Sequence, residues 1–272
     1  MTSPIEISNL EFSKISKLVY DSFGITLNDS KKSLVVNRLN KLLRTKGFST
    51  FKQYYEMLLK DKSGAELQEL ANSISTNHTY FNRESKHFEY FEKTALPEVV
   101  RNIRDKDLRI WCCASSTGEE PYTLAMLQHE FFGSCISEWK AGLLASDISE
   151  KALRKAIAGQ YDKEDVEKLP ARLKNNYFTR VNDKYVVKSH IKKDVTYTKI
   201  NLVKPFQFKK RFHIIFCRNV MIYFDQPTKD DLINRFYEWI EPGGYLFIGH
   251  AETIPRDRCP FKYIMPAVYR KV

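Results

Sequence analysis

Residues 109–125 read RIWCCASSTGEEPYTLA, and this stretch decides the fold class. It opens with a short apolar run at 110–113, which predicts a buried strand. Small residues at 114–118 then allow a sharp turn and a close approach of the backbone to a ligand. Pro121 suits the first turn of a helix, where a missing N–H is not needed. The stretch therefore predicts a strand, a tight turn and a helix N-terminus, the unit of an α/β fold.

The turn is acidic, which bears on the ligand it would accept. Glu119 and Glu120 follow it directly, where they would repel a pyrophosphate and hold an ammonium, a sulfonium or ribose hydroxyls. Ligands of open α/β sheets bind at the carboxyl ends of strands. The turn has neither the G-x-G-x-x-G pattern nor a P-loop lysine, so phosphate binding is disfavoured. A structural alternative stays open, in which both carboxylates only complement the helix dipole.

Composition limits the class of protein. The 272 residues allow one large and one smaller domain, and 43% hydrophobic with 28% charged residues is ordinary for a globular chain. No apolar run approaches the ~20 residues of a membrane span, and the start MTSPIEISNL does not resemble a signal peptide, so we expect a cytoplasmic protein. Five cysteines without a C-x-x-C pair indicate neither metal nor disulfides. The net charge of +11 indicates an anionic partner.

Residues 1 to about 75 show helical periodicity and predict a small helical bundle. The second predicted helix, which ends at Gly47, carries Arg38, Lys41 and Arg44 at every third position, so that they lie along one side of it. An ordinary solvated face is one interpretation. A docking surface for an acidic partner is the other.

The polar segment at 75–85, STNHTYFNRES, follows the bundle and precedes a predicted helix at about 86–104. Asn77, Thr79 and Arg83 supply an amide, a hydroxyl and a guanidinium within seven positions. Polar loops of this kind carry function more often than core segments do. Taken alone, however, the segment is better interpreted as a structural linker.

A second predicted strand, at about 143–145, ends in Ser146 and Asp147. An acidic residue that closes the second strand of a βαβ unit is placed to accept hydrogen bonds from a ribose diol. The alternative is that Asp147 caps the helix that begins near Ser149, and both roles are compatible.

Beyond this helix the pattern changes. Residues 177–187, YFTRVNDKYVV, predict a hairpin in a small antiparallel insert. A further strand ends in Asn201 and Leu202, and the tail FKYIMPAVYRKV predicts a closing hairpin.

Another buried strand is predicted at 212–217, with Arg218 and Asn219 at its carboxyl end and Tyr223 four residues on. Parallel strands end at the same edge of a sheet, so these residues are expected near Gly118 and Asp147. A buried arginine is costly without partners, which indicates a ligand or a structural anion nearby.

Five motifs, in this order and spacing, resemble the CheR family of chemotaxis receptor methyltransferases: NHTYFNRE, CCASSTGEEPYTLA, ASDIS with AIAGQY, FCRNVMIYF and GGYLFIGHAET. The resemblance implies an N-terminal helical domain at 1–75 and a linker and helix at 76–104. It also implies a class I (Rossmann-like) α/β methyltransferase domain at 105–272 that binds S-adenosylmethionine, with a β-subdomain inserted at about 172–192.

The resemblance also implies a set of cofactor contacts. By match to the family motifs these are Asn77, Thr79, Arg83, Glu120, Asp147, Asn201, Leu202, Arg218 and Asn219. Two positions depart from the family pattern: Asn82 stands where a second Phe is common, and Ala251 stands where Ser is common.

The implied reaction transfers a methyl group from S-adenosylmethionine to receptor glutamates, giving γ-methyl esters and S-adenosylhomocysteine. We hypothesise that Arg83 positions the substrate carboxylate and that Tyr223 shapes the cleft. The acidic receptor would be the partner of Arg38, Lys41 and Arg44, and the β-subdomain is a second candidate contact. Two alternatives stay open, a nucleic-acid methyltransferase and a non-catalytic binding module. Against the first, the chain lacks an N-P-P-Y type tetrapeptide and a strip of interleaved aromatic and basic residues.

Overall fold

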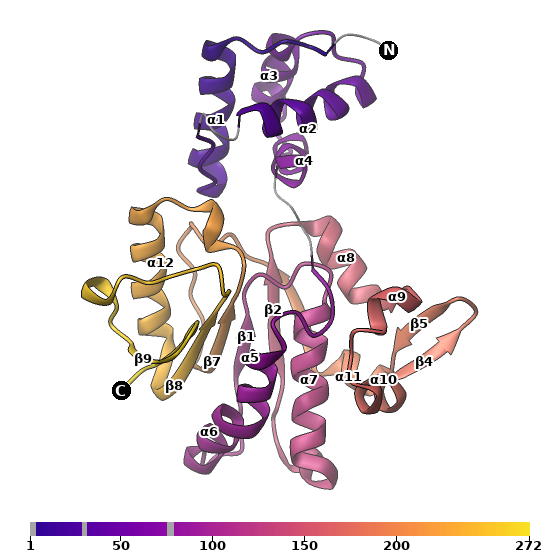
Figure 1. The fold of residues 1–272 in the computed structure, drawn as a ribbon, viewed down its shortest axis with the longest axis vertical. Coiled ribbons are helices and arrows are strands. Elements are labelled where there is room, and N and C mark those ends of the chain that lie inside the picture. Colours follow the sequence, from indigo (N-terminus) through magenta and orange to yellow (C-terminus); the bar gives the residue numbers. More distant parts are fainter. Residues whose placement is uncertain (1–3, 29–31, 75–78) are drawn as a thin grey trace. The chain divides into compact units, whose positions relative to one another are not determined.

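The structure, a computed structural model, describes residues 4–28, 32–74 and 79–272. The chain divides into two compact units (Figure 1): Met1–His78 with Tyr223–Thr228, and Thr79–Ile222 with Lys229–Val272. Within the described ranges, no helix combines the length and apolar character that a membrane span requires.

In the described residues 4–28 and 32–74, the first unit has four helices, as the periodicity predicts. They are α1 (Asn9–Phe23), α2 (Lys32–Thr45), α3 (Phe51–Lys60) and α4 (Ala65–Ile74). Ser8 and Glu11 form a capping box at the start of α1, and Gly24 ends that helix in the left-handed conformation. Fully buried side chains from the helices, among them Ile15, Leu39 and Tyr54, form one core.

The second unit is built on a seven-stranded mixed sheet with the order β6-β2-β1-β7-β8-β10-β9. Its strands are β1 (Ile110–Cys112), β2 (Leu143–Asp147), β6 (Val195–Lys199), β7 (Phe212–Cys217), β8 (Ile240–Ile248), β9 (Lys262–Met265) and β10 (Val268–Arg270). The strands from β6 to β8 are parallel, and β10 pairs with β8 and β9 antiparallel. The predicted α/β fold and closing hairpin are confirmed.

Helices cover both faces of this sheet. On one face lie α5 (Ser85–Tyr90), the π-helix η2 (Phe91–Ala95), α6 (Leu96–Asn102), α7 (Glu119–Phe132) and α8 (Glu150–Ala158) (Figure 1). On the other face Trp111 of β1 contacts Phe236 of α12 (Gln226–Trp239). Because β1 is buried on both faces, its sequence is continuously apolar rather than alternating. The second unit also contains the short 3-10 turns η3 (Gly133–Glu138) and η5 (Arg256–Arg258). A further 3-10 turn, η4 (Met221–Tyr223), begins in the second unit and ends at Tyr223, which belongs to the first.

The predicted hairpin is present, with β4 (Phe178–Val181) and β5 (Lys184–Val187) joined through Asn182 at a positive φ of 53°. A third strand, β3 (Gln160–Tyr161), pairs with β5 and lies upstream of the expected insert. The short helices α9 (Lys163–Val166), α10 (Ala171–Tyr177) and α11 (Ser189–Lys193) accompany this small sheet (Figure 1).

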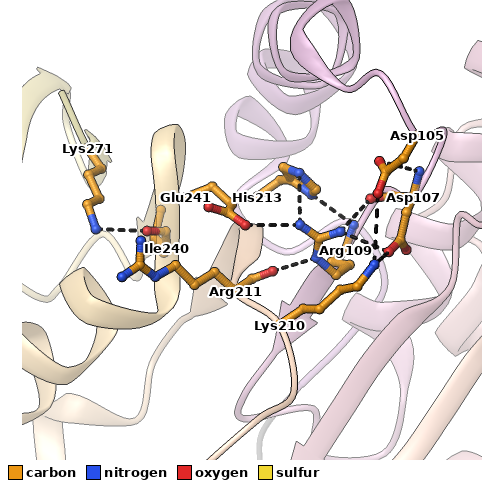
Figure 2. Close-up of polar contacts among 9 residues, drawn as sticks. All are labelled: Asp105, Asp107, Arg109, Lys210, Arg211, His213, Ile240, Glu241 and Lys271. Carbon is orange, nitrogen blue, oxygen red and sulfur yellow. Dashed lines mark hydrogen bonds and ion pairs between the residues drawn. The ribbon is translucent and has the colours of Figure 1, made fainter.

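At the amino-terminal edge of the large sheet, Arg109 joins the starts of three neighbouring strands (Figure 2). Its guanidinium contacts Asp107 at 2.9 Å, Glu241 at 3.1 Å and the carbonyl of Arg211 at 2.6 Å. The backbone N–H of Arg109 donates to Nδ1 of His213 at 3.1 Å, so this nitrogen has to be unprotonated. Burial, and then the charge of Arg109, lower the pKa of His213 to about 4. This edge therefore depends on a neutral histidine.

We predict that His213→Gln reduces the sensitivity of the fold to acid. The pKa of His213 lies below its ordinary value in the folded state, so the stability it contributes is complete above about pH 6.5 and is lost as the pH falls toward 4. Melting temperatures of both proteins at pH 7 and pH 5 test this. The variant should lose less stability on acidification than the wild type, and an equal loss in both would contradict the role assigned to this histidine.

Candidate cofactor site

The carboxyl ends of four parallel strands meet at the edge opposite Arg109. In the register of the sheet, Cys112 of β1 lies between Ala145 of β2 and Phe216 of β7, so the segments that follow these strands are neighbours. Segments 113–120, 146–149 and 218–219 thereby come to one place, as predicted. Asn201 follows β6, the strand next to β2.

The turn after β1 uses two left-handed residues, Ser116 (φ 46°) and Gly118 (φ 99°). A Cβ atom at Gly118 would lie 2.7 Å from the hydroxyl of Tyr161 and 2.9 Å from that of Tyr197. Glycine is therefore required at this position both by its conformation and by space. Helix α7 begins at Glu119 directly after it.

Asp147 is oriented by the backbone around it. One carboxylate oxygen accepts the N–H of Ser116 and the other that of Ser149, both at 2.8 Å. Burial raises the pKa of Asp147 although these hydrogen bonds oppose the shift. The N-cap of α8 is Ser149, whose side chain accepts the N–H of Ala152. Each oxygen of Asp147 keeps lone-pair capacity, which suits the two hydroxyls of a ribose.

The two glutamates of the turn have different environments. Glu119 is only 3% exposed, and both of its oxygens lie 2.7 Å from the hydroxyl of Thr117. Burial raises the pKa of Glu119. Glu119 is thus part of the turn itself, and of the two interpretations left open for this residue the structural one fits its environment. Glu120 instead accepts the thiol of Cys112 at 3.0 Å and forms an ion pair with Arg218.

Arg218 is the centre of the site. Its side chain is 2% exposed, and its guanidinium contacts Glu120, the carbonyl of Arg83 and Glu84, the last at 3.0 Å. Burial alone would lower its pKa, but the two carboxylates outweigh burial and raise it. The sequence left open a ligand or a structural anion beside this arginine, and the structure provides this pair of glutamates as structural anions.

Glu84 was missed by the sequence analysis. Its carboxylate accepts Arg218, the amide of Asn219 at 3.1 Å and the backbone N–H of His250 at 3.2 Å. Burial would raise the pKa of Glu84, but Arg218 and Asn219 together hold it below its usual value. The signal available was its place in the NHTYFNRE motif.

Glu252 was also missed, although it lies in the GHAET motif. Its carboxylate accepts backbone N–H groups from Gly249 at 2.6 Å, Asn219 at 3.0 Å and Ile222 at 3.3 Å. Burial raises the pKa of Glu252 against these hydrogen bonds. Glu252 therefore ties the loop after β7 to the loop after β8. A Cβ atom at Gly249 would lie 2.4 Å from the Asn219 amide nitrogen.

Potential ligand atoms of Glu84, His87 and His250 lie within 4.8 Å of one another. The Glu84 oxygen nearest His87 already accepts hydrogen bonds from Arg218 and from the His250 backbone. Burial lowers the pKa of His87 to about 4, and its ring packs edge-on against Phe247 and His250. We interpret Glu84, His87 and His250 as structural residues that pack around Arg218 and its hydrogen-bond partners, not as a metal site.

The remaining predicted residues are placed as follows. Thr79 and Arg83 are half-buried, and Asn77 lies outside the described residues. The Asn201 side chain accepts the N–H of Val203 at 3.2 Å, and Leu202 is buried with its carbonyl accepting Arg235. Tyr223 belongs to the first unit, where its carbonyl accepts the N–H of Thr26.

The two departures from the family pattern, Asn82 and Ala251, fit the structure. The first fits through its backbone conformation and the second through its exposure to solvent. Asn82 has a positive φ of 60°, a conformation that asparagine tolerates better than a bulky aromatic residue. Ala251 is exposed on the loop after β8, so a change between Ser and Ala there alters no buried contact.

The strand order, the acidic strand end and the tight turn define a methyltransferase domain of the S-adenosylmethionine-binding class. The chain matches the family model described as CheR methyltransferase, SAM binding domain, over residues 77–269 and the CheR methyltransferase all-alpha domain over residues 10–75. It belongs to the CheR methyltransferase family, and its cofactor is S-adenosylmethionine.

Relatives of known name agree with this membership. The chain is 44% identical to a chemotaxis protein methyltransferase of Borreliella burgdorferi, over 98% of this chain and 96% of that protein. It is 37% identical to the chemotaxis protein methyltransferase of Escherichia coli K12, over 93% of this chain and 87% of that protein.

The donor set fits this cofactor. A buried carboxylate with remaining acceptor capacity suits a ribose diol, and a partly exposed carboxylate at the start of α7 suits an ammonium group. We infer that Asp147 and Glu120 take these two roles.

We predict that Asp147→Asn weakens S-adenosylhomocysteine binding by roughly 10–100-fold, because hydrogen bonds to a charged group contribute about 1.5–3 kcal/mol. Isothermal titration calorimetry measures this. Glu150→Gln, an exposed carboxylate at the start of α8, is the control and should bind normally. A normal affinity in Asp147→Asn would exclude Asp147 from the site, and melting temperatures show whether either variant is misfolded.

Proposed function

We propose that this chain transfers the methyl group of S-adenosylmethionine to glutamate side chains of chemotaxis receptors, forming γ-methyl esters. The observation that carries the proposal is the near full-length match to chemotaxis protein methyltransferases, together with an intact set of polar side chains at the cofactor edge. A nucleic-acid methyltransferase has no comparable support.

For this reaction the main task of the protein is to position the substrate carboxylate and the methyl group. A glutamate with a pKa of about 4.3 is already ionised at neutral pH, so the nucleophile needs no general base. S-adenosylmethionine supplies an activated methyl group. The protein then has to hold the carboxylate oxygen in line with that group and exclude water. We propose that Asp147 and Glu120 orient the cofactor, with further contacts from Asn77, Thr79, Arg83, Asn201, Leu202, Arg218 and Asn219.

For the acceptor we propose Arg83 as the cation that positions the substrate carboxylate, with Tyr223 shaping the cleft. Arg83 precedes Glu84 and its carbonyl accepts Arg218, so its backbone is held by the same network as the cofactor residues. The side chain of Arg83 is half-buried, which leaves part of it accessible to a substrate.

We predict that Arg83→Ala lowers kcat for receptor methylation by ~100-fold, in the range that loss of a positioning charge produces. Steady-state methyl transfer to a receptor fragment measures it. Arg101→Ala, which removes an exposed arginine near the end of α6, should leave kcat unchanged. Normal turnover in Arg83→Ala would remove this residue from the mechanism.

The basic surface of α2 is the proposed docking site for an acidic receptor segment, and the inserted sheet of β3, β5 and β4 is a second proposed contact. Arg38 donates to the carbonyl of Ile74 at the end of α4, so part of its role is to hold α2 and α4 together. Lys41 and Arg44 are exposed, and we assign the docking role chiefly to them.

We predict that the double variant Lys41→Glu and Arg44→Glu raises KM for the receptor at least about tenfold while S-adenosylhomocysteine affinity stays unchanged. Reversed charges repel an acidic partner, and the effect should shrink at high salt. Lys14→Glu with Lys17→Glu makes the same change in net charge on α1, where both side chains are exposed, and serves as the control. Equal losses in the two double variants would argue for a general charge effect instead of a docking surface.

Methyl transfer itself tests the proposed function. Labelled S-adenosylmethionine is incubated with receptor cytoplasmic fragments, with fragments in which the glutamates are alanine, and with RNA and DNA. Base-labile label that disappears with the glutamates supports the proposal. Label on nucleic acid would favour the competing substrate, and cofactor binding without any transfer would favour a non-catalytic module.

A further inference from the structure

Glu84 has an unusual position for an acidic residue at a helix start. It is the N-cap residue of α5 and has a left-handed conformation with φ 57°, yet its side chain makes no capping hydrogen bond. A carboxylate at this position ordinarily accepts an N–H of the first helical turn. The carboxylate of Glu84 is instead directed at Arg218 and Asn219, at 3.0 and 3.1 Å.

Arg218 is thereby shared between two carboxylates. One Nη atom contacts Glu120 and the other contacts Glu84. The Nε atom of Arg218 is buried and, among the described residues, has no hydrogen-bond partner. With a side chain only 2% exposed, the guanidinium depends on these protein partners because water does not reach it.

The charges of this group do not cancel. Glu84 and Glu120 carry two negative charges against one positive charge on Arg218, so one negative charge remains. The amino-acid end of S-adenosylmethionine presents an ammonium group, whose single positive charge would match this remaining negative charge. If Glu84 were neutral, Arg218 would compensate Glu120 fully and no net charge would be left for the cofactor.

Two neighbouring titratable groups, His87 and Cys112, do not change this balance. Burial keeps His87 neutral at physiological pH and keeps the thiol of Cys112 protonated. The backbone N–H of His250 donates to Glu84, and a ring nitrogen of His250 lies within 4.8 Å of the Glu84 carboxylate. Glu252 is engaged by the backbone N–H groups of Asn219 and Gly249.

We propose that Glu84 is a positioning residue for the amino-acid end of the cofactor, acting through Arg218. By sharing the guanidinium it leaves Glu120 the negative charge that an ammonium group requires. The proposal rests on the proposed function, since it assumes that S-adenosylmethionine occupies this edge. It adds a residue that is outside the set of cofactor contacts given by the family motifs.

The test compares two ligands that differ only at the relevant end. S-adenosylhomocysteine carries the ammonium and carboxylate, whereas 5′-methylthioadenosine keeps the adenosine and the sulfur but lacks both. Calorimetry on the full chain should show Glu84→Gln weakening S-adenosylhomocysteine binding by at least about tenfold, with 5′-methylthioadenosine changed less than about twofold. Glu89→Gln, an exposed carboxylate on the same helix, should change neither.

A charge-retaining variant separates electrostatics from packing. Glu84→Asp keeps the charge and shortens the side chain, whereas Glu84→Gln keeps the size and removes the charge. Positioning through charge predicts that Asp loses less affinity for S-adenosylhomocysteine than Gln does. Two results would overturn the proposal in favour of a structural role. One is that Glu84→Gln binds both ligands more weakly by the same factor, and the other is that Glu84→Asp loses more affinity for S-adenosylhomocysteine than Glu84→Gln does. An unchanged S-adenosylhomocysteine affinity in Glu84→Gln would also overturn it.

Failure of the proposed function has a different signature. A wild-type chain that binds S-adenosylhomocysteine but does not methylate receptor fragments would contradict receptor methylation and leave the two-ligand comparison valid. A wild-type chain that binds neither ligand would contradict both proposals.

Discussion

The interaction on which the rest of the site depends is the buried guanidinium of Arg218 between Glu84 and Glu120. A buried charge is strongly destabilising when one partner is removed, so the three groups constrain one another. They also come from three separate elements, the start of α5, the start of α7 and the end of β7. These contacts therefore hold in place the edge of the sheet at which we propose that the cofactor binds.

The fold brings these groups together through strand order. Because β1 lies between β2 and β7, the tight turn after β1 has an acidic strand end on one side and the Arg218 loop on the other. Gly118 permits that turn, and Glu252 holds the neighbouring loop through backbone hydrogen bonds. At the other edge Arg109 performs a comparable structural role with Asp107 and Glu241 (Figure 2). Ion pairs therefore secure both ends of the parallel strands, and the cofactor is expected at one of them.

Much of this architecture could be predicted from local pattern. The strand, turn and helix at 109–125 follow from apolar runs, small residues and Pro121, and the hairpin at 177–187 follows from its β-prone residues. Asp147 could be assigned because its position depends only on the end of its own strand. Arg218 and Asn219 could be placed at the same edge by the same reasoning about strand ends. The family motifs supplied Asn77, Thr79, Arg83, Asn201 and Leu202 as cofactor contacts, which physical reasoning from the sequence alone left undecided.

What could not be predicted depends on contacts between distant segments. Glu84 and Arg218 are 134 positions apart. Nothing in the local sequence predicts that the side chain of an acidic residue at a helix start contacts a distant arginine instead of capping its own helix. Strand β3 has two residues, too few for a period, and it forms only because β5 is beside it. Glu119 and Glu120 are identical in type and adjacent, so only the packing of α7 determines that one is buried and the other faces the site.

A crystal structure of the chain with bound S-adenosylhomocysteine tests the central claim most directly. The account predicts that the amino group of the ligand lies within hydrogen-bond distance of Glu120, about 2.7–3.2 Å, while Arg218 still contacts Glu84. A ligand whose amino group is held elsewhere, with Arg218 paired to Glu120 alone, would contradict it.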